Sequence, residues 1–207
     1  GYRRKARLGV KYVPKKGRVL VGFRERGSSF LAEIESCEVL HPKVGQLLMP
    51  LSDLIGRLTI RDRVPQIEVS MGDDVCVLVF RVLEPPTLED TKALEQFGLE
   101  HGMAIYLQEA GPDSVRPLSG EPVRLSYALP DFGLDVQFLP NDFTQVNSEL
   151  NRLMVARAVE LLELDDTDRV LDLFCGIGNF TLPLARQAKS VVGVEGDRAL
   201  VERARDN

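Results

Sequence analysis

The chain has 207 residues, a formal net charge of −5, 44% hydrophobic residues and 28% charged residues. This length suits one large or two small domains, and no apolar run approaches the roughly 20 residues of a membrane-spanning helix. Its three cysteines, Cys37, Cys76 and Cys175, are far apart. This spacing argues against a disulfide framework or a C-x-x-C zinc site and favours a reducing, cytoplasmic location.

The ends of the sequence suggest a piece of a longer protein. Gly1 lies directly inside a basic and apolar pattern, no signal peptide opens the chain, and Asn207 lies within a helical segment. We therefore expect a fragment that was cut at both ends.

Positive charge is concentrated at the start of the chain. Residues 1–26 contain ten Lys or Arg residues and one acidic residue, giving this stretch a charge of +9, so the other 181 residues carry −14. Such asymmetry favours a polyanion-binding face. A solvated hairpin surface is the alternative interpretation.

Residues 1–135 are predicted to form an α+β domain. Alternating basic and apolar residues at 3–13 and 19–24 indicate a β-hairpin. Helical spacing at 44–58 predicts a helix that Pro50 kinks or breaks, and an amphipathic helix is expected at 88–102. Further strands are predicted at 30–34, 66–70, 75–83, 104–108 and 123–128.

Residues 136–207 are predicted to begin an α/β domain. A bridging segment leads to a helix at 148–164, followed by the loop at 165–168. The apolar face of that helix is predicted to comprise Leu150, Leu153, Met154, Ala158, Leu161 and Leu162.

The segment 170–195 is the most informative part of the chain, because it combines a strand, a glycine turn, a helix, a second strand and a carboxylate. Gly176 and Gly178 open the backbone to a ligand, and Glu195 has the spacing of a ribose-binding acid. Thr181 replaces the third glycine of the dinucleotide pattern, which favours a nucleoside without a pyrophosphate, such as S-adenosylmethionine. An ordinary βαβ turn without a ligand is the alternative.

Four segments together resemble the class I S-adenosylmethionine-dependent RNA uracil-5-methyltransferases. The segments are residues 2–8 (YRRKARL), Gly22-Phe23-Arg24 with Ser28-Ser29 and Cys37, residues 142–147 (DFTQVN), and residues 170–180. The detail is most similar to the branch that modifies uridine 1939 of 23S ribosomal RNA.

This resemblance implies an α+β central domain followed by the first part of an α/β Rossmann-like methyltransferase domain. It also implies chemistry in which a cysteine adds to carbon 6 of uracil before methyl transfer to carbon 5. The nucleophilic cysteine and the general base are expected beyond Asn207, so no catalytic residue and no turnover are expected from this chain alone. Cys76 and Cys175 are interpreted as packing residues.

The resemblance assigns roles residue by residue. An S-adenosylmethionine site is implied for Gln145, Phe174, Gly176, Gly178, Asn179 and Glu195. Cys37 would be one of four ligands of a [4Fe–4S] cluster, with the other three upstream. Contacts with 23S ribosomal RNA are implied for Arg3, Arg4, Lys5, Arg7 and Phe143.

Several of these assignments have alternatives. Phe143 could be a core residue, and Asn147 is interpreted as a helix N-cap. Strand alternation would place Arg3, Lys5 and Arg7 on one face and Arg4 on the other. No membrane and no protein partner are inferred.

Two other functions stay open at this point. The first is a tRNA uracil-5-methyltransferase, which the presence of Cys37 disfavours. The second is a non-catalytic RNA-binding module in which the glycine turn is vestigial.

Overall fold

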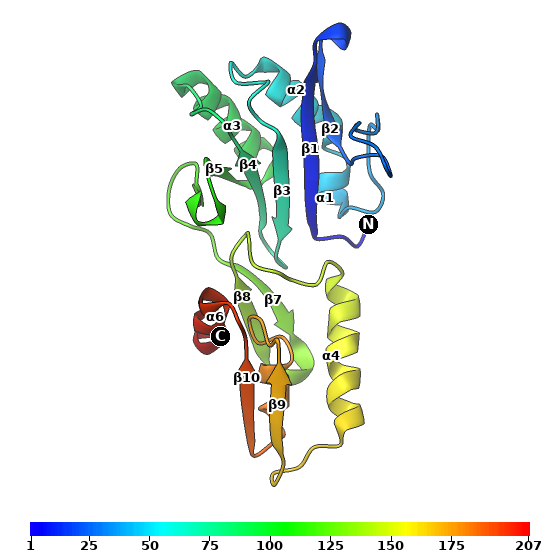
Figure 1. Cartoon of the computed structure of the whole chain (residues 1–207), viewed down its shortest axis with the longest axis vertical. Helices are drawn as coiled ribbons and strands as arrows, with labels where there is room; N and C mark the ends of the chain where they lie inside the picture. Colours follow the sequence, from blue (N-terminus) through cyan, green and yellow to red (C-terminus); the bar gives the residue numbers. More distant parts are fainter. The chain divides into compact units, whose positions relative to one another are not determined.

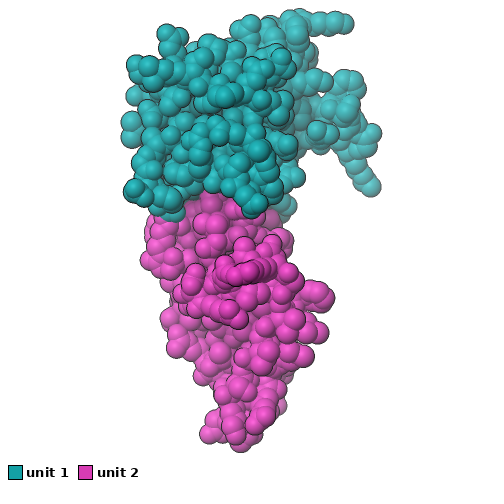
Figure 2. All heavy atoms as spheres, turned by 60° about the vertical axis from the view of Figure 1, so that its left-hand side comes forward, with its two compact units in different colours: residues 1–71, 75–123 teal, residues 72–74, 124–207 magenta.

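The computed structural model describes all 207 residues, which form two compact units. The first unit contains Gly1–Met71 and Val75–Val123, and the second contains Gly72–Asp74 and Arg124–Asn207 (Figure 2). This division differs from the boundary predicted at residue 135. Strands β7 (Leu125–Leu129) and β8 (Leu134–Phe138) pair only with each other, so both remain in the second unit.

The first unit is an α+β fold around a six-stranded sheet with the order β2-β1-β3-β4-β5-β6 (Figure 1). Neighbouring strands are antiparallel except β4 and β5, which are parallel and are connected by α3. The strands are β1 (Lys5–Val13), β2 (Arg18–Gly22), β3 (Gln66–Met71), β4 (Cys76–Arg81), β5 (Ala104–Gln108) and β6 (Val115–Pro117).

One face of this sheet and the helices enclose the core. The fully buried side chains Leu51 and Ile55 of the second helix belong to the same cluster as Ile67, Leu78 and Phe80 of the central strands. Burying such side chains is the main stabilising contribution of a core of this kind. The helices are α1 (Pro42–Gly45), α2 (Leu48–Arg57) and α3 (Leu88–His101), and short 3-10 turns are η1 (Pro14–Lys16) and η2 (Pro112–Ser114).

In place of the single helix predicted at 44–58, the structure has two helices, α1 and α2. The interruption falls at Gln46 and Leu47 rather than at Pro50. Pro50 lies in the first turn of α2, where a backbone N–H has no partner within the helix, so proline is tolerated there.

The strand predicted at 30–34 is wrong, because only Leu31 forms a bridge, with Arg24. This segment instead lies against the β1–β2 hairpin at two glycines. A Cβ on Gly9 would lie 2.5 Å from Leu31 Cδ2, and one on Gly22 would lie 3.4 Å from Ala32 O. The two glycines thus leave room for the chain to pass over the hairpin.

The second unit combines the β7–β8 hairpin with the start of an α/β layer (Figure 1). Strands β9 (Arg169–Leu173) and β10 (Ser190–Val194) are parallel, as expected for a Rossmann-like domain. The other elements are η3 (Pro130–Phe132), α4 (Ser148–Leu162), α5 (Thr181–Leu184) and α6 (Arg198–Asp206). None of the helices in either unit combines the length and the hydrophobicity needed to cross a membrane.

The buried face of α4 differs from the predicted apolar face. Val155 and Val159 are buried, together with the polar Asn151, whereas five residues of the predicted face are at least 38% exposed. These are Leu150, Leu153, Met154, Leu161 and Leu162. Arg152, next to Asn151, donates hydrogen bonds to Ala128 O at 2.9 Å and to Asp73 Oδ2 at 2.8 Å, so polar contacts also hold this side of α4.

Candidate cofactor site and nucleic-acid surface

The glycine turn and the acidic residue meet at the carboxyl ends of β9 and β10. The parallel register pairs Leu173 with Val194, and the Cys175 N–H extends this pairing by donating to Val194 O at 3.1 Å. The turn that begins at Phe174 therefore lies beside Glu195. Strand ends of this kind are the usual ligand position in open α/β sheets.

The backbone of the turn is left-handed at three positions. The φ angles are 60° at Phe174, 54° at Gly176 and 95° at Gly178. No heavy atom would lie within 4 Å of a Cβ on Gly176, so the backbone is open to approach there, whereas a Cβ on Gly178 would lie 3.0 Å from Leu182 Cγ. Phe174 is 89% exposed, and a bulky side chain in this conformation is uncommon.

The Glu195 carboxylate connects the two strand ends. Its Oε2 accepts a hydrogen bond from the Gly176 N–H at 3.0 Å, and its Oε1 accepts from the N–H groups of Gly196 at 2.7 Å and Asp197 at 3.0 Å. The N–H groups of Asp197 and then Gly176 lower the pKa of Glu195 below its ordinary value, so the carboxylate stays ionised. An ionised acid at this position can accept hydrogen bonds from ribose hydroxyls.

The side chain of Asn179 is engaged within the protein. Its Oδ1 accepts hydrogen bonds from Tyr127 Oη at 2.8 Å and Asn151 Nδ2 at 2.9 Å, and its Nδ2 donates to Asn151 Oδ1 at 3.0 Å. Burial raises the pKa of Tyr127, which keeps its hydroxyl a donor. Asn179 therefore ties the turn to α4 and β7, and a ligand contact through its side chain would compete with these bonds.

The segment before α4 presents exposed residues on a fixed backbone. Phe143 is 72% exposed, so it is not a core residue, and Gln145 is exposed as well. The neighbouring Asp142 is buried, and its Oδ2 accepts from the Leu139 N–H at 2.7 Å and from Arg203 Nε of α6 at 3.1 Å. Asn147 is the predicted N-cap, since its Oδ1 accepts from the Leu150 N–H at 3.0 Å.

Asn207, the C-cap residue of α6, also supports the glycine turn. Asn207 Nδ2 donates to Ile177 O at 3.1 Å and to Gln137 O at 3.0 Å. Asp142 lies within the quoted DFTQVN motif, but Asn151, Tyr127 and Arg203 were not predicted as part of this region. No sequence motif marked them, because their partners are distant along the chain.

Two of the three cysteines have environments that oppose thiolate formation. Burial raises the pKa of Cys76 to about 11. Burial and then the negative charge of Asp172 raise the pKa of Cys175, and a Cβ on Gly193 would lie 2.9 Å from Cys175 Sγ. Both are packing residues in the structure, whereas a nucleophilic cysteine needs a lowered pKa.

Cys37 is half-buried against the core of the first unit, and its N–H donates to Gly45 O at 2.9 Å. A [4Fe–4S] cluster takes four cysteine ligands. Residues 1–207 contain no group of three or more His, Cys, Asp or Glu side chains that could hold a metal ion, so they do not fit a cluster by themselves.

The predicted RNA-contacting arginines and lysine lie at the start of the first unit. Arg3 precedes β1 and forms a bridge with Leu40, while Lys5 and Arg7 lie on the face of β1 opposite to the buried Ala6 and Leu8. Arg7 pairs with Glu68 of β3. Its Nε and Nη2 atoms lie 3.0 Å and 2.9 Å from Glu68 Oε1, and its side chain is 70% exposed.

Comparisons with known proteins agree on one family. The family model described as tRNA (Uracil-5-)-methyltransferase matches residues 118–207. A protein of Nitrosococcus oceani named 23S rRNA (uracil(1939)-C(5))-methyltransferase RlmD is 59% identical over 99% of this chain and 45% of its own length. A protein of the same name from Alkalilimnicola ehrlichii is 57% identical over the whole chain and 47% of its own length.

The chain thus spans about half the length of the curated relatives that it matches. Among solved structures, the tRNA (uracil-54, C5)-methyltransferase of Pyrococcus abyssi in complex with S-adenosyl-L-homocysteine is similar in fold. The TM-score is 0.73 at 20% identity, covering 99% of this chain and 52% of that one. The central and Rossmann-like parts predicted from the sequence are therefore present as a methyltransferase fold.

Proposed function

Because the chain belongs to the RNA uracil-5-methyltransferase family, we propose that the longer protein containing it methylates carbon 5 of uridine 1939 in 23S ribosomal RNA. S-Adenosylmethionine would supply the methyl group, and the reaction would take place in the cytoplasm. The choice of ribosomal over transfer RNA is supported by the names of the relatives at 57% and 59% identity.

The observation that carries this proposal is the meeting of the glycine turn with Glu195 at adjacent strand ends. Gly176 has a left-handed backbone, and the space that a Cβ would occupy there is open. Main-chain N–H groups hold the ionised Glu195 beside it. In the proposed complex Glu195 accepts hydrogen bonds from the ribose, and Phe174 and Gln145 contact the rest of the cofactor.

The chemistry requires more than these residues supply. Carbon 5 of uracil becomes nucleophilic when a thiolate adds to carbon 6; after methyl transfer a base removes the carbon 5 proton and the thiolate leaves. Cys76 and Cys175 have raised pKa values, so we propose that the thiolate and the base come from outside residues 1–207. The role of the second unit is to bind the methyl donor, and that of Phe143 is to contact the target base.

Calorimetric titration of S-adenosylmethionine into the full-length protein tests the cofactor site. Glu195→Ala should weaken binding about 10-fold or more, because charge-assisted hydrogen bonds contribute about 1.5–3 kcal/mol. Glu195→Gln, which retains one acceptor oxygen, should weaken it less. The control is Glu202→Ala on α6, an exposed glutamate that pairs with Arg198 and should leave affinity unchanged.

Equal affinities of the parent and Glu195→Ala would remove Glu195 from the site. Methyl transfer to a tRNA transcript, with none to a 23S ribosomal RNA segment carrying uridine 1939, would replace the proposed substrate with tRNA.

We also propose that Cys37 contributes one thiolate to a [4Fe–4S] cluster whose other ligands lie outside residues 1–207. No step of methyl transfer depends on this cluster. Iron analysis and visible absorption of the full-length protein test the assignment: Cys37→Ser should lose most of the bound iron, while Cys76→Ser, in the core, is the matched control. Full iron content in the Cys37→Ser protein would show that this thiol is not a ligand.

A further inference from the structure

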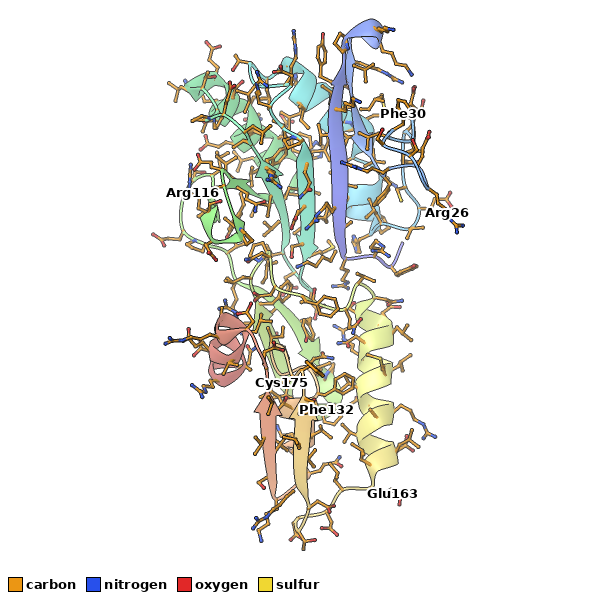
Figure 3. All side chains as sticks on the ribbon, viewed as in Figure 1. Arg26, Phe30, Arg116, Phe132, Glu163 and Cys175 are labelled. Atoms are coloured by element: carbon orange, nitrogen blue, oxygen red, sulfur yellow. The ribbon has the colours of Figure 1, made fainter.

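An exposed aromatic ring lies on the segment that joins β2 to α1. Phe30 is 66% exposed, and the ammonium group of Lys11 lies 6.0 Å from the centre of its ring. Figure 3 shows Phe30 and Arg26 on this same segment. An aromatic ring that is open to water beside a cation is available to stack on a nucleobase.

The backbone under this ring is well ordered by hydrogen bonds. The Glu25 N–H donates to Phe30 O at 3.0 Å, and the Phe30 N–H donates to Ser28 Oγ at 3.0 Å. The next residue, Leu31, is only 8% exposed and lies over Gly9 of β1. The backbone that carries the ring is therefore held by hydrogen bonds on one side and by the packing of Leu31 on the other.

Two arginines precede the ring on the same segment. Arg24 and Arg26 are exposed there, and the acid Glu25 lies between them in the sequence. By contrast, Lys16 and Arg18 are paired with Glu33, so they contribute less to this surface.

A row of cations leads from the predicted RNA-contacting residues to the ring. Strand alternation places Lys11 on the same face of β1 as Lys5 and Arg7, because Ala6, Leu8 and Val10 point into the core. Six residues of extended strand span about 20 Å, the length of a few nucleotides. Cations that follow a strand and end at an aromatic ring are the features with which proteins bind single-stranded nucleic acid.

We propose that Phe30 is a stacking platform for an unpaired base of the ribosomal RNA substrate, with Lys11 and Arg26 binding the adjacent phosphates. The platform is distinct from Arg7 and Phe143, and it would read the RNA outside the target uridine. This inference rests on the proposed function, because it takes ribosomal RNA as the ligand.

The test is the affinity of the full-length protein for a 23S ribosomal RNA segment that carries uridine 1939, measured by fluorescence anisotropy. Phe30→Ala should weaken binding about 5- to 150-fold, the effect of losing one stacked base, whereas Phe30→Trp should retain binding. The matched control is Leu99→Ala, which truncates an apolar side chain that is 79% exposed on α3 of the same unit and should have no effect.

A salt series tests the phosphate contacts. Arg26→Ala should reduce the slope of log affinity against log salt by about 0.7, the value for one phosphate contact with a single strand. Lys92→Ala, which removes an exposed cation from α3, should leave the slope unchanged.

The outcomes separate the two proposals. Parent-like RNA affinity of Phe30→Ala, or a loss in Phe30→Trp as large as that in Phe30→Ala, would overturn the stacking platform and leave the methyltransferase proposal intact. Failure of the parent protein to bind the ribosomal RNA segment would overturn the proposed substrate itself. Titration of S-adenosylmethionine into each variant should give the parent affinity, since Phe30 belongs to the other unit from the cofactor site.

Discussion

Phe174 combines an unfavourable backbone conformation with an exposed ring. A non-glycine residue with a φ of 60° costs about 1–3 kcal/mol, and a side chain that is 89% exposed gains little from packing. Neither property contributes to the stability of residues 1–207. Strain of this kind tends to occur where a ligand binds, which supports a role for Phe174 beside the cofactor.

Replacing Phe174 with glycine should therefore separate stability from binding. Glycine accepts the left-handed conformation but adds entropy to the unfolded chain, so the free energy of unfolding should fall by no more than about 1 kcal/mol. The affinity for S-adenosylmethionine should fall about 5-fold or more, because the contact with the ring is lost. Urea unfolding and calorimetry of the full-length protein measure the two quantities.

Phe132→Leu, on η3 of the same unit, controls for the loss of an aromatic ring in that experiment. An unchanged cofactor affinity for Phe174→Gly would show that the ring is exposed for another reason.

Single residues were predictable where their partners are close along the chain. Asn147 was predicted as an N-cap, because its acceptor bonds a backbone N–H three residues later, and this is confirmed. The bonds from Tyr127 and Asn151 to Asn179 were not foreseen, since they span 52 and 28 residues. Local patterns carry no information about such pairings.

At the scale of elements, α3 shows how local signals define a helix. Thr87 and Asp90 form a capping box at its start, and Gly102 ends it in a left-handed conformation with a φ of 59°. Asp90 also accepts hydrogen bonds from the Thr59 N–H at 2.7 Å and from Thr59 Oγ1 at 2.5 Å. One carboxylate thus connects α3 to the loop after α2.

Asp90→Asn should lower the free energy of unfolding by about 1–3 kcal/mol at neutral pH, because the charged acceptor is lost. Burial acts to raise the pKa of Asp90, but hydrogen bonds from Thr59 and Thr87 outweigh it and lower the pKa. The stabilisation is therefore present above the ordinary value of 3.8 and is lost as the pH falls through the lowered value in the folded state.

Urea unfolding between neutral and acidic pH tests this expectation. The difference between the parent and Asp90→Asn should shrink in acid, while the exposed Asp113→Asn should match the parent throughout. A difference that stays constant with pH would mean that the charge of Asp90 is not the stabilising property.

Elements were predicted well where the hydrophobic period was regular. The β1–β2 hairpin is confirmed, because alternation along 3–13 and 19–24 indicated its strands and the residues Pro14 to Gly17 indicated its turn. The strand predicted at 30–34 is wrong because its apolar residues pack over two glycines instead of forming a ladder. Strand β8 was not predicted, although Leu134–Phe138 alternates, because the proline and polar residues that follow made the whole segment resemble a linker.

At the scale of the whole molecule, the positively charged stretch and the predicted cofactor site belong to different compact units. The residues with a charge of +9, at 1–26, all lie in the first unit, and the turn with Glu195 lies in the second. The proposed RNA contacts of Arg7, Lys11 and Phe30 are thus assigned to one compact unit, whereas the proposed cofactor contacts and Phe143 belong to the other. Substitutions at Arg7, Lys11 and Phe30 can therefore be tested for RNA binding without altering the cofactor site.

The face of α4 that the sequence marked as apolar has a practical consequence. Leu150, Leu153 and Leu161 on this face are more than half exposed, and the middle of β9 and of β10 adds Leu171 and Val192 in the same unit. Apolar side chains exposed in such numbers promote association, and an open strand edge adds unpaired backbone groups. Residues 1–207 purified alone are therefore expected to self-associate as their concentration rises, which light scattering over a dilution series would measure.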